Sequence, residues 1–300
     1  MPPIVSFLKR DSVLMKITDI IKGNKPSLSF EVFPPKTSDN FESVMAATGA
    51  IADLSPSYMS VTYGAGGGTS KFTADIARRL LEMGVTPLAH LSCISSRKED
   101  IKELLSDLRE RGIENILALR GDIPAGMEID CPDYRYASQL CSEIRDFGGF
   151  CIGGACYPES HPESENGQKD IESLKIKVDC GCEFLTTQMF FDNSILYNFM
   201  YRLLRAGVDV PVVAGIMPVT GAKQIKRICA ISGQQLPQRF IRLVDRYGQS
   251  DAAMKQAGIA YATEQIIDLY ANGVNAVHVY SMNKPDVAEA IRNNVSEIIK

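Results

Sequence analysis

Residues 87–122 read PLAHLSCISSRKEDIKELLSDLRERGIENILALRGD, and this stretch contains the unit from which the fold is built. The apolar run Pro87–Ser92 has the length and composition of a buried strand. From Ser96, a residue type favoured at helix starts, apolar positions recur at helical spacing until Gly112, a residue type that ends helices. A second apolar run, Asn115–Arg120, follows after a short gap. The stretch therefore predicts a strand, a helix and another strand.

The same alternation recurs along the chain. The runs that predict strands are Leu28–Phe33, Tyr58–Tyr63, Pro87–Ser92, Asn115–Arg120, Cys151–Tyr157, Phe184–Phe190, Val210–Met217 and Ala276–Ser281. Eight strand–helix units without a linker-like Pro/Ser/Gly stretch favour an α/β fold in one domain, residues 1–300, closed as a (β/α)₈ TIM barrel. A doubly wound sheet stays open as the alternative, because counting strands does not demonstrate closure.

Helices beyond the repeating units are also expected. We expect an N-terminal helix before the first strand, and the insert Gln234–Tyr247 before the last strand predicts an extra helix or two. The tail Lys284–Lys300 has the pattern of the closing helix.

Composition excludes several classes of protein. A formal charge of −4 gives no electrostatic reason to expect nucleic acid or an anionic membrane as partner. The start of the chain has no signal-peptide pattern and the chain has no apolar run long enough to span a membrane, so we expect a cytoplasmic protein. The 8 cysteines form no CxxC pair and the 3 histidines lie far apart in sequence, so we expect reduced thiols and no metal site.

Glu31 is the first candidate for chemistry. It lies in the segment SLSFEVFPPK, among Phe30, Val32 and Phe33. Burial among apolar residues raises the pKa of a carboxyl group toward the range useful to a general acid. A structural ion pair at a barrel end is the alternative interpretation.

Two further segments follow predicted strands. In LALRGD, Gly121 lets the backbone approach a ligand, Arg120 can bind a phosphate or a ring carbonyl, and Asp122 can tune a redox ring. A plain Arg–Asp pair in a turn is the alternative. The glycine-rich VTYGAGGGTS (61–70) matches neither GxGxxG nor a Walker loop, and offers only small residues beside a helix start.

Segments 154–164 and 186–193 complete the candidate site. GACYPESHPES carries Tyr157 and His161 in a proline-bent loop, and the next helix carries Lys177, which can meet a diphosphate or lie on a solvated face. TTQMFFDN places Gln188 beside aromatic residues, a combination suited to a flat heteroaromatic ligand or, alternatively, to capping the strand.

Together and in this order, these motifs resemble the methylenetetrahydrofolate reductase family. The matching motifs are SFEVFPPK, VTYGAGG, the strand-end His90, LALRGD, YPESHPE, TTQMFFD, GIMPVT and HVYSMNK, and they extend from Leu28 to Lys284. Each motif is weak alone, but the ordered set is specific. The chain resembles the short bacterial type that has the catalytic domain only, so we expect no S-adenosylmethionine-binding regulatory domain.

The resemblance implies a flavoprotein oxidoreductase of one-carbon metabolism and methionine biosynthesis. It would bind FAD and reduce 5,10-methylenetetrahydrofolate to 5-methyltetrahydrofolate with NAD(P)H in a ping-pong cycle. Glu31 matches the general acid, and Asp122 matches an aspartate between flavin and pterin. The positions that match cofactor contacts are Thr62, Tyr63, Ala65, His90, Arg120, Gly121, Asp122, Tyr136, Ala137, Tyr157, His161, Asp170 and Lys177. Those that match folate contacts are Asp122, Gln188, Gln224 and Lys284.

The chain departs from the family pattern at four positions. Ser173 replaces an asparagine, Ile176 an arginine, Ile228 a phenylalanine and Lys284 an arginine. The change at 176 affects the expected diphosphate or adenine contacts, and the change at 228 removes a ring that could stack on substrate. Lys284 can still pair with a glutamate-tail carboxylate, without the bidentate geometry of arginine.

Other functions fit parts of the sequence. Electrons could come from a partner redox protein in place of NAD(P)H. A flavin-free barrel lyase or aldolase would use Lys177 or Lys284, and a non-catalytic subunit of a redox complex is a third possibility. We expect a homo-oligomer.

Overall fold

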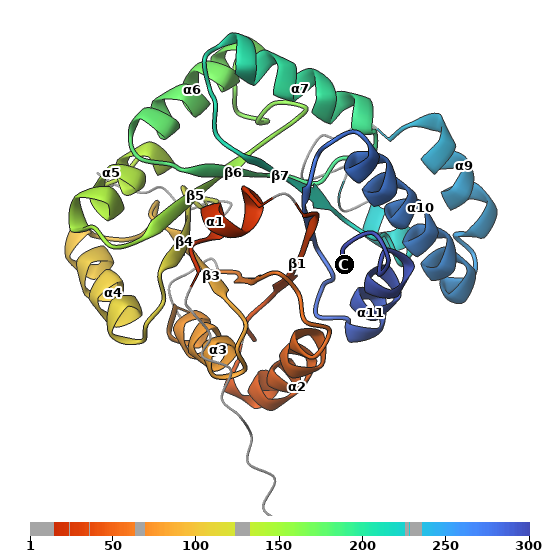
Figure 1. The fold of residues 1–300 in the computed structure, drawn as a ribbon, viewed down its shortest axis with the longest axis horizontal. Coiled ribbons are helices and arrows are strands. Elements are labelled where there is room, and N and C mark those ends of the chain that lie inside the picture. The colour runs from red at the N-terminus through yellow and green to blue at the C-terminus, as the bar shows by residue number, and fades with distance from the viewer. Residues whose placement is uncertain are drawn as a thin grey trace, which may run out of the picture.

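The structure, a computed structural model, describes residues 15–23, 25–35, 37–63, 70–123, 133–225, 228 and 236–300. Parallel strands form a closed barrel in chain order (Figure 1). The strands are β1 (Ser27–Val32), β2 (Met59–Val61), β3 (Pro87–Ser92), β4 (Asn115–Leu119), β5 (Cys151–Cys156), β6 (Phe184–Thr187), β7 (Val212–Ile216) and β8 (Ala276–Val279). Strand β1 pairs with β2 on one side and with β8 on the other, so the predicted closure is confirmed and the doubly wound alternative is wrong.

Helices surround the barrel (Figure 1). They are α1 (Ile17–Ile21), the 3₁₀ helix η1 (Ser38–Asn40), α2 (Phe41–Ala52), α3 (Ser70–Glu82), α4 (Lys98–Glu110), α5 (Ala137–Phe147), α6 (Gly167–Asp179), α7 (Asn193–Arg205), α9 (Gln238–Tyr247), α10 (Asp251–Ala271) and α11 (Pro285–Asn294). The expected N-terminal helix, the helix in the insert and the closing helix are all present, as α1, α9 and α11. Within the described part of the chain, no helix combines the length and apolar character needed to cross a membrane.

The core explains why the strands are apolar throughout. Parallel strands in this fold have side chains inside the barrel on one face and helices on the other, so both faces are buried. All six residues of β1 are buried. On α4 the buried positions are Ile101, Leu105 and Leu108, which is the helical spacing visible in the sequence.

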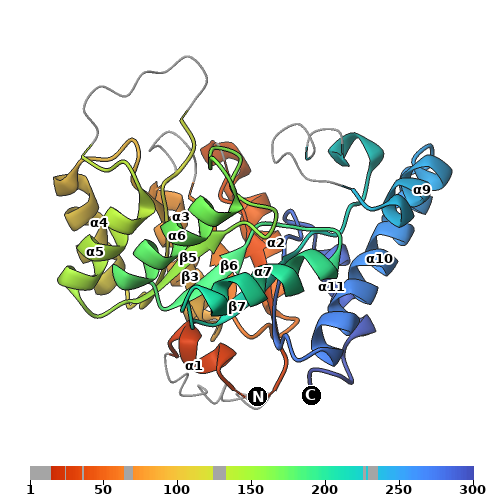
Figure 2. The same cartoon turned by 90° about the horizontal axis from the view of Figure 1, so that it is seen from above.

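Helix α1 closes one end of the barrel. Ile17 and Ile21 pack against residues at the starts of the strands, including Tyr58 and Leu88. Asn115 fastens this helix, because its Oδ1 accepts a hydrogen bond of 2.8 Å from Ile17 N and its Nδ2 donates one of 3.3 Å to Pro87 O. In Figure 2, α1 lies on the side of the molecule where the chain ends. The carboxyl ends of the strands lie at the opposite end of the barrel, which is the end where this fold binds ligands.

Candidate active site

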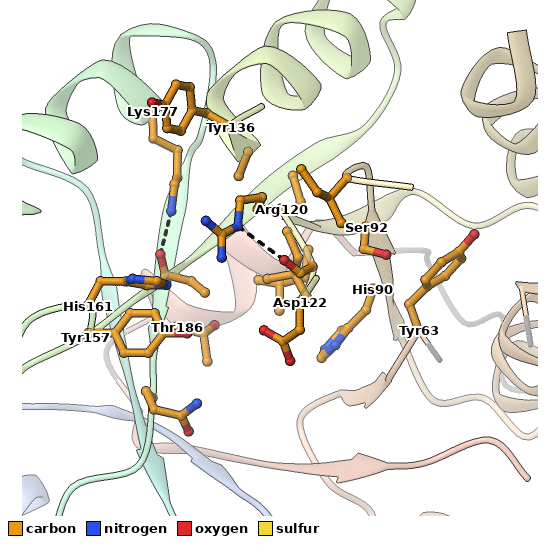
Figure 3. Close-up of a pocket in the computed structure, with 18 of the residues that line it drawn as sticks. Tyr63, His90, Ser92, Arg120, Asp122, Tyr136, Tyr157, His161, Lys177 and Thr186 are labelled. Atoms are coloured by element: carbon orange, nitrogen blue, oxygen red, sulfur yellow. Dashed lines mark hydrogen bonds between the residues drawn. The ribbon is translucent and has the colours of Figure 1, made fainter. Parts of the chain in front are cut away.

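A cavity of about 1250 Å³ opens at the carboxyl ends of the strands. This is the end at which (β/α)₈ enzymes hold their active sites. Figure 3 shows its polar side chains converging from several strands. The predicted site residues that line it are Glu31, Tyr63, His90, Arg120, Gly121, Asp122, Tyr136, Ala137, Tyr157, His161, Asp170, Lys177 and Gln188.

Glu31 comes from the last part of β1. Its neighbours Phe30 and Val32 are completely buried, and Glu31 itself is only 6% exposed while lining the cavity. Burial raises the pKa of its carboxyl group from 4.5 to about 8. The carboxyl group therefore keeps its proton at neutral pH, as a general acid must.

Arg120 and Asp122 follow β4 on either side of Gly121. Gly121 has φ of +88°, and a Cβ atom there would lie 3.0 Å from the Cβ of Ser92, so the sharp exit from the strand requires glycine. The Arg120 guanidinium binds both carboxylate oxygens of Glu163, with Nη2 2.7 Å from Oε1. This pairing lowers the pKa of Glu163. The Asp122 side chain extends toward the same space as His90 (Figure 3).

The opposite wall of the cavity comes from β5 and α6. The rings of Tyr157 and His161 meet edge to face with centroids 4.6 Å apart. Lys177 Nζ donates a hydrogen bond of 2.6 Å to Ala155 O (Figure 3). Asp170 is buried beside them, and burial raises its pKa.

Two buried polar atoms of the lining have no hydrogen-bond partner among the residues that the structure describes. They are Nε2 of His90 and Oγ1 of Thr186. Buried polar groups in native proteins are nearly always paired, so such atoms at a cavity wall are expected to bind a ligand or water. Thr186 was not among the predicted residues. Its position two residues before Gln188, on the same face of the strand, is the signal that identifies it.

Of the predicted residues that the structure describes, Thr62, Gln224 and Lys284 do not line the cavity. Ala65 lies outside the described residues. Thr62 follows β2, and its carbonyl accepts a hydrogen bond from Thr73. Gln224 and Lys284 lie beyond the cavity but meet at Thr220: Gln224 Oε1 accepts from Thr220 N at 3.3 Å, and Lys284 Nζ donates to Thr220 Oγ1 at 2.6 Å.

The model of the methylenetetrahydrofolate reductase family matches residues 16–296. The chain belongs to this family. A 5,10-methylenetetrahydrofolate reductase of Pectobacterium carotovorum is 35% identical over 266 residues, 88% of each chain. The enzyme of the same name from Escherichia coli K12 is 32% identical over 284 residues, 94% of each chain. The Arabidopsis thaliana methylenetetrahydrofolate reductase (NADH) 1 is 32% identical, and the match covers 95% of this chain and 51% of the plant protein. As a member of the family, the chain is an oxidoreductase.

A solved structure agrees with the fold of this reductase. An uncharacterized protein from Clostridium thermocellum, described as binding two copies of 5-methyl-5,6,7,8-tetrahydrofolic acid, superimposes with a TM-score of 0.65. The match covers 95% of this chain and 99% of that one at 12% sequence identity, so it supports the fold alone.

The departures from the reductase family pattern have different surroundings. Ser173 and Ile176 line the cavity on α6, and Ile176 is 56% exposed. Ile228 is buried in an apolar cluster with Phe191 and Phe240 and does not line the cavity. The structure therefore gives no support to a loss of substrate stacking at position 228.

Proposed function

We propose that this reductase converts 5,10-methylenetetrahydrofolate to 5-methyltetrahydrofolate with NAD(P)H as reductant and FAD as cofactor, in a ping-pong cycle at one site. The observation that carries the proposal is Glu31, a carboxylic acid that burial keeps protonated inside the cavity of a (β/α)₈ barrel of this family. The chemistry of the folate requires such an acid, because the methylene bridge accepts hydride poorly until N10 is protonated.

The cavity fits a flavin together with a second ring system. Its volume of about 1250 Å³ exceeds the roughly 300–1,000 Å³ typical of a single-ligand pocket. Arg120 and Lys177 supply positive charge for a diphosphate, and the unpartnered atoms of His90 and Thr186 can bind the polar edge of a ring. Bound flavin would supply two-electron transfer from the nicotinamide to the folate. Tyr63, Tyr136, Tyr157 and the other cofactor positions would hold it.

Glu31 acts on the folate. The methylene bridge joins N5 and N10 of the folate and accepts hydride poorly. We assign to Glu31 the transfer of its proton to N10, which breaks the bond between N10 and the methylene carbon. The electron pair of that bond stays on N10, and the carbon becomes part of an iminium cation with N5. The carbon of this cation accepts hydride readily, the electron pair of the C=N double bond returns to N5, and the carbon becomes the N5-methyl group.

Asp122 and the polar residues beyond it assist the same step. A carboxylate at the cavity wall stabilises the positive charge that develops on the iminium group. Gln188 would bind the pterin edge. Gln224 and Lys284, which meet at Thr220, would bind the glutamate tail of the folate, outside the main cavity.

The structure offers less to a lyase that forms a Schiff base. Such an enzyme needs a lysine amine free to attack a carbonyl. Lys177 Nζ is engaged with Ala155 O at 2.6 Å, and Lys284 lies outside the cavity lining. We therefore place the lyase second to the reductase.

Anaerobic half-reactions test the proposal directly. Purified protein should carry the yellow absorbance of flavin, lose it on addition of NADH or NADPH, and regain it on addition of methylenetetrahydrofolate. A colourless protein would contradict the role of FAD. Flavin that is bleached by a reduced artificial dye but by neither nicotinamide would assign electron supply to a partner redox protein.

A further inference from the structure

Asn283 pairs through its side chain with the backbone of Phe33, two residues after Glu31. Its Oδ1 accepts a hydrogen bond of 2.8 Å from Phe33 N, and its Nδ2 donates one of 2.8 Å to Phe33 O. The ladder between β1 and β8 has already ended, because its last pair is Phe30 with Val279. Beyond the end of this ladder, the side-chain amide of Asn283 thus makes the hydrogen bonds to the β1 segment that a residue of β8 would otherwise make.

The chain adopts an unusual conformation to bring this amide into place. Met282 and Asn283 both lie in the left-handed region, with φ of +58° and +54°. Residues with a Cβ atom seldom adopt this region, and asparagine adopts it more readily than most. These two residues closely follow Tyr280, which lines the cavity, and backbone strain of this kind clusters at functional sites.

The pairing joins two parts of the proposed site. On one side, Phe33 and Glu31 both line the cavity. Ser281 Oγ adds a contact of 3.4 Å to the carbonyl oxygen of Glu31. On the other side, Asn283 directly precedes Lys284, which is the N-cap residue of α11 and donates a hydrogen bond to Thr220 Oγ1. One side chain therefore couples the strand end of the proposed acid to the loop that carries the proposed tail-binding lysine.

We propose that Asn283 is a positioning residue for folate reduction, which fixes the end of β1 and so the direction in which Glu31 presents its proton relative to Lys284. This inference rests on the proposed function, because it assigns Asn283 to the half-reaction that uses Glu31. Asn283 does not line the cavity, so its effect must pass through the Phe33 backbone.

Three variants separate positioning from stability. Asn283→Gly removes the amide while glycine keeps the left-handed backbone accessible. Asn283→Asp keeps an acceptor for Phe33 N and loses the donor to Phe33 O. The matched control is Asn115→Ala, which removes an amide that also bridges backbone groups, those of Met15, Ile17 and Pro87, but at the opposite end of the barrel.

The holoenzyme of each variant is tested in both half-reactions. For Asn283→Gly we expect reoxidation by methylenetetrahydrofolate to slow by about tenfold to a hundredfold, as small misplacements of catalytic groups do. Reduction by NAD(P)H should stay within about twofold of wild type, because Glu31 serves only the folate step. The rate of reoxidation in Asn283→Asp should lie between the rates in wild type and in Asn283→Gly. Asn115→Ala should lower thermal stability and leave both half-reactions unchanged.

Two further readouts follow the strand end itself. Hydrogen exchange in residues 28–35 should be faster in Asn283→Gly than in Asn115→Ala. The midpoint of the pH profile for the folate step should move to lower pH, because a looser strand end lets water reach the Glu31 carboxyl.

The outcomes distinguish this inference from the proposed function. A wild-type holoenzyme that methylenetetrahydrofolate does not reoxidise would overturn the proposed function and the role of Asn283 with it. A wild type that is reoxidised, beside an Asn283→Gly variant that keeps its rate, would overturn the role of Asn283 alone. Equal losses in both half-reactions would also overturn it, since they would mark a structural residue.

Discussion

Glu31 Oε2 lies 3.8 Å from His90 Nε2, and the two groups face each other without charge at neutral pH. The separation is too long for a hydrogen bond. Burial raises the pKa of Glu31 to about 8 and lowers the pKa of His90 to about 3. The carboxyl group therefore keeps its proton at neutral pH, and the imidazole ring is neutral. The pair is therefore an acid beside a neutral ring, and it is not an ion pair.

His278 extends this uncharged region below Glu31. Ser29 Oγ donates to Val277 O at 3.0 Å, so it accepts from His278 Nδ1 at 2.8 Å. His278 Nε2 is then left to accept from Ser60 Oγ at 3.0 Å. Burial lowers the pKa of His278 to about 3, and the neutral ring ties β1, β2 and β8 together. Neither histidine offers a positive charge that would ionise Glu31.

Replacing Glu31 by glutamine should separate the two half-reactions. We expect Glu31→Gln to slow reoxidation of the reduced enzyme by methylenetetrahydrofolate by about 10²–10⁴-fold, the usual contribution of a general acid. Reduction by NAD(P)H should stay near the wild-type rate, because that step needs no proton on N10. Stopped-flow absorbance of the flavin measures both steps. Equal losses would assign Glu31 a structural role and end its assignment as the acid.

The same substitution should change how stability depends on pH. The Glu31 carboxyl has a pKa near 4.5 when the chain is unfolded and about 8 when it is folded. Its stabilising effect is full below pH 4.5 and is lost as pH rises to about 8, because only the unfolded chain ionises in that window. The loss is at most about 5 kcal/mol. The free energy of unfolding of Glu31→Gln, compared with that of wild type, should therefore be more favourable at pH 9 than at pH 5.

Denaturation of the flavin-free protein at the two pH values checks this expectation. Glu103→Gln is the matched control, since Glu103 is exposed on the outer face of α4. It should leave the pH dependence as in wild type. If Glu31→Gln does the same, the Glu31 carboxyl is not shielded from water and its proposed role as an acid at neutral pH fails.

The fold could be predicted from the sequence because its signal is local and repeated. Each helix such as α4 shows its buried face at helical spacing, and each strand is short and apolar. Closure could not be predicted in this way. It depends on the pairing of β1 with β8, whose residues lie about as far apart in the chain as the fold allows.

In the candidate site, too, residues with a local sequence signal could be predicted and contacts between distant residues could not. Glu31, Arg120 and Gln188 could be predicted because each is a polar residue at the end of an apolar run. The partner of Arg120 could not, since Glu163 is one of several acidic residues in its loop and only the folded loop selects it. The contact between Asn283 and Phe33 joins residues 250 positions apart, and no local pattern indicates it.

The Arg120–Glu163 pair leads to a prediction about flavin affinity. If Arg120 binds the cofactor, it must first give up Glu163, whose side chain is 62% exposed. Such an exposed pair contributes about 0–1 kcal/mol. Glu163→Gln should therefore tighten FAD binding by up to about fivefold. Titration of the apoprotein, followed by flavin fluorescence, measures this.

A control at a neighbouring carboxylate isolates the effect. Glu172→Gln removes the same charge from α6, where Glu172 pairs with Lys169 and not with Arg120. It should leave FAD affinity unchanged. Weaker FAD binding in Glu163→Gln would instead mean that Glu163 holds Arg120 in the orientation that the cofactor needs.

Ile176 places an exposed apolar side chain where the cavity meets α6. It is 56% exposed, and Ser173 and Lys177 lie beside it on the lining. An arginine at this position could bind a diphosphate with two parallel hydrogen bonds. We expect Ile176→Arg to tighten FAD binding by about tenfold at low salt, and by less as salt screens the new charge.

Comparison of two flavins and two substitutions shows where the gain arises. FMN lacks the second phosphate and the adenosine, so its affinity should change little in Ile176→Arg. Ile176→Gln removes the apolar side chain without adding charge and should leave FAD affinity near that of wild type. If FMN gained as much as FAD, the new charge would be acting on the flavin end of the cavity. The nucleotide half of the cofactor would then not lie along α6.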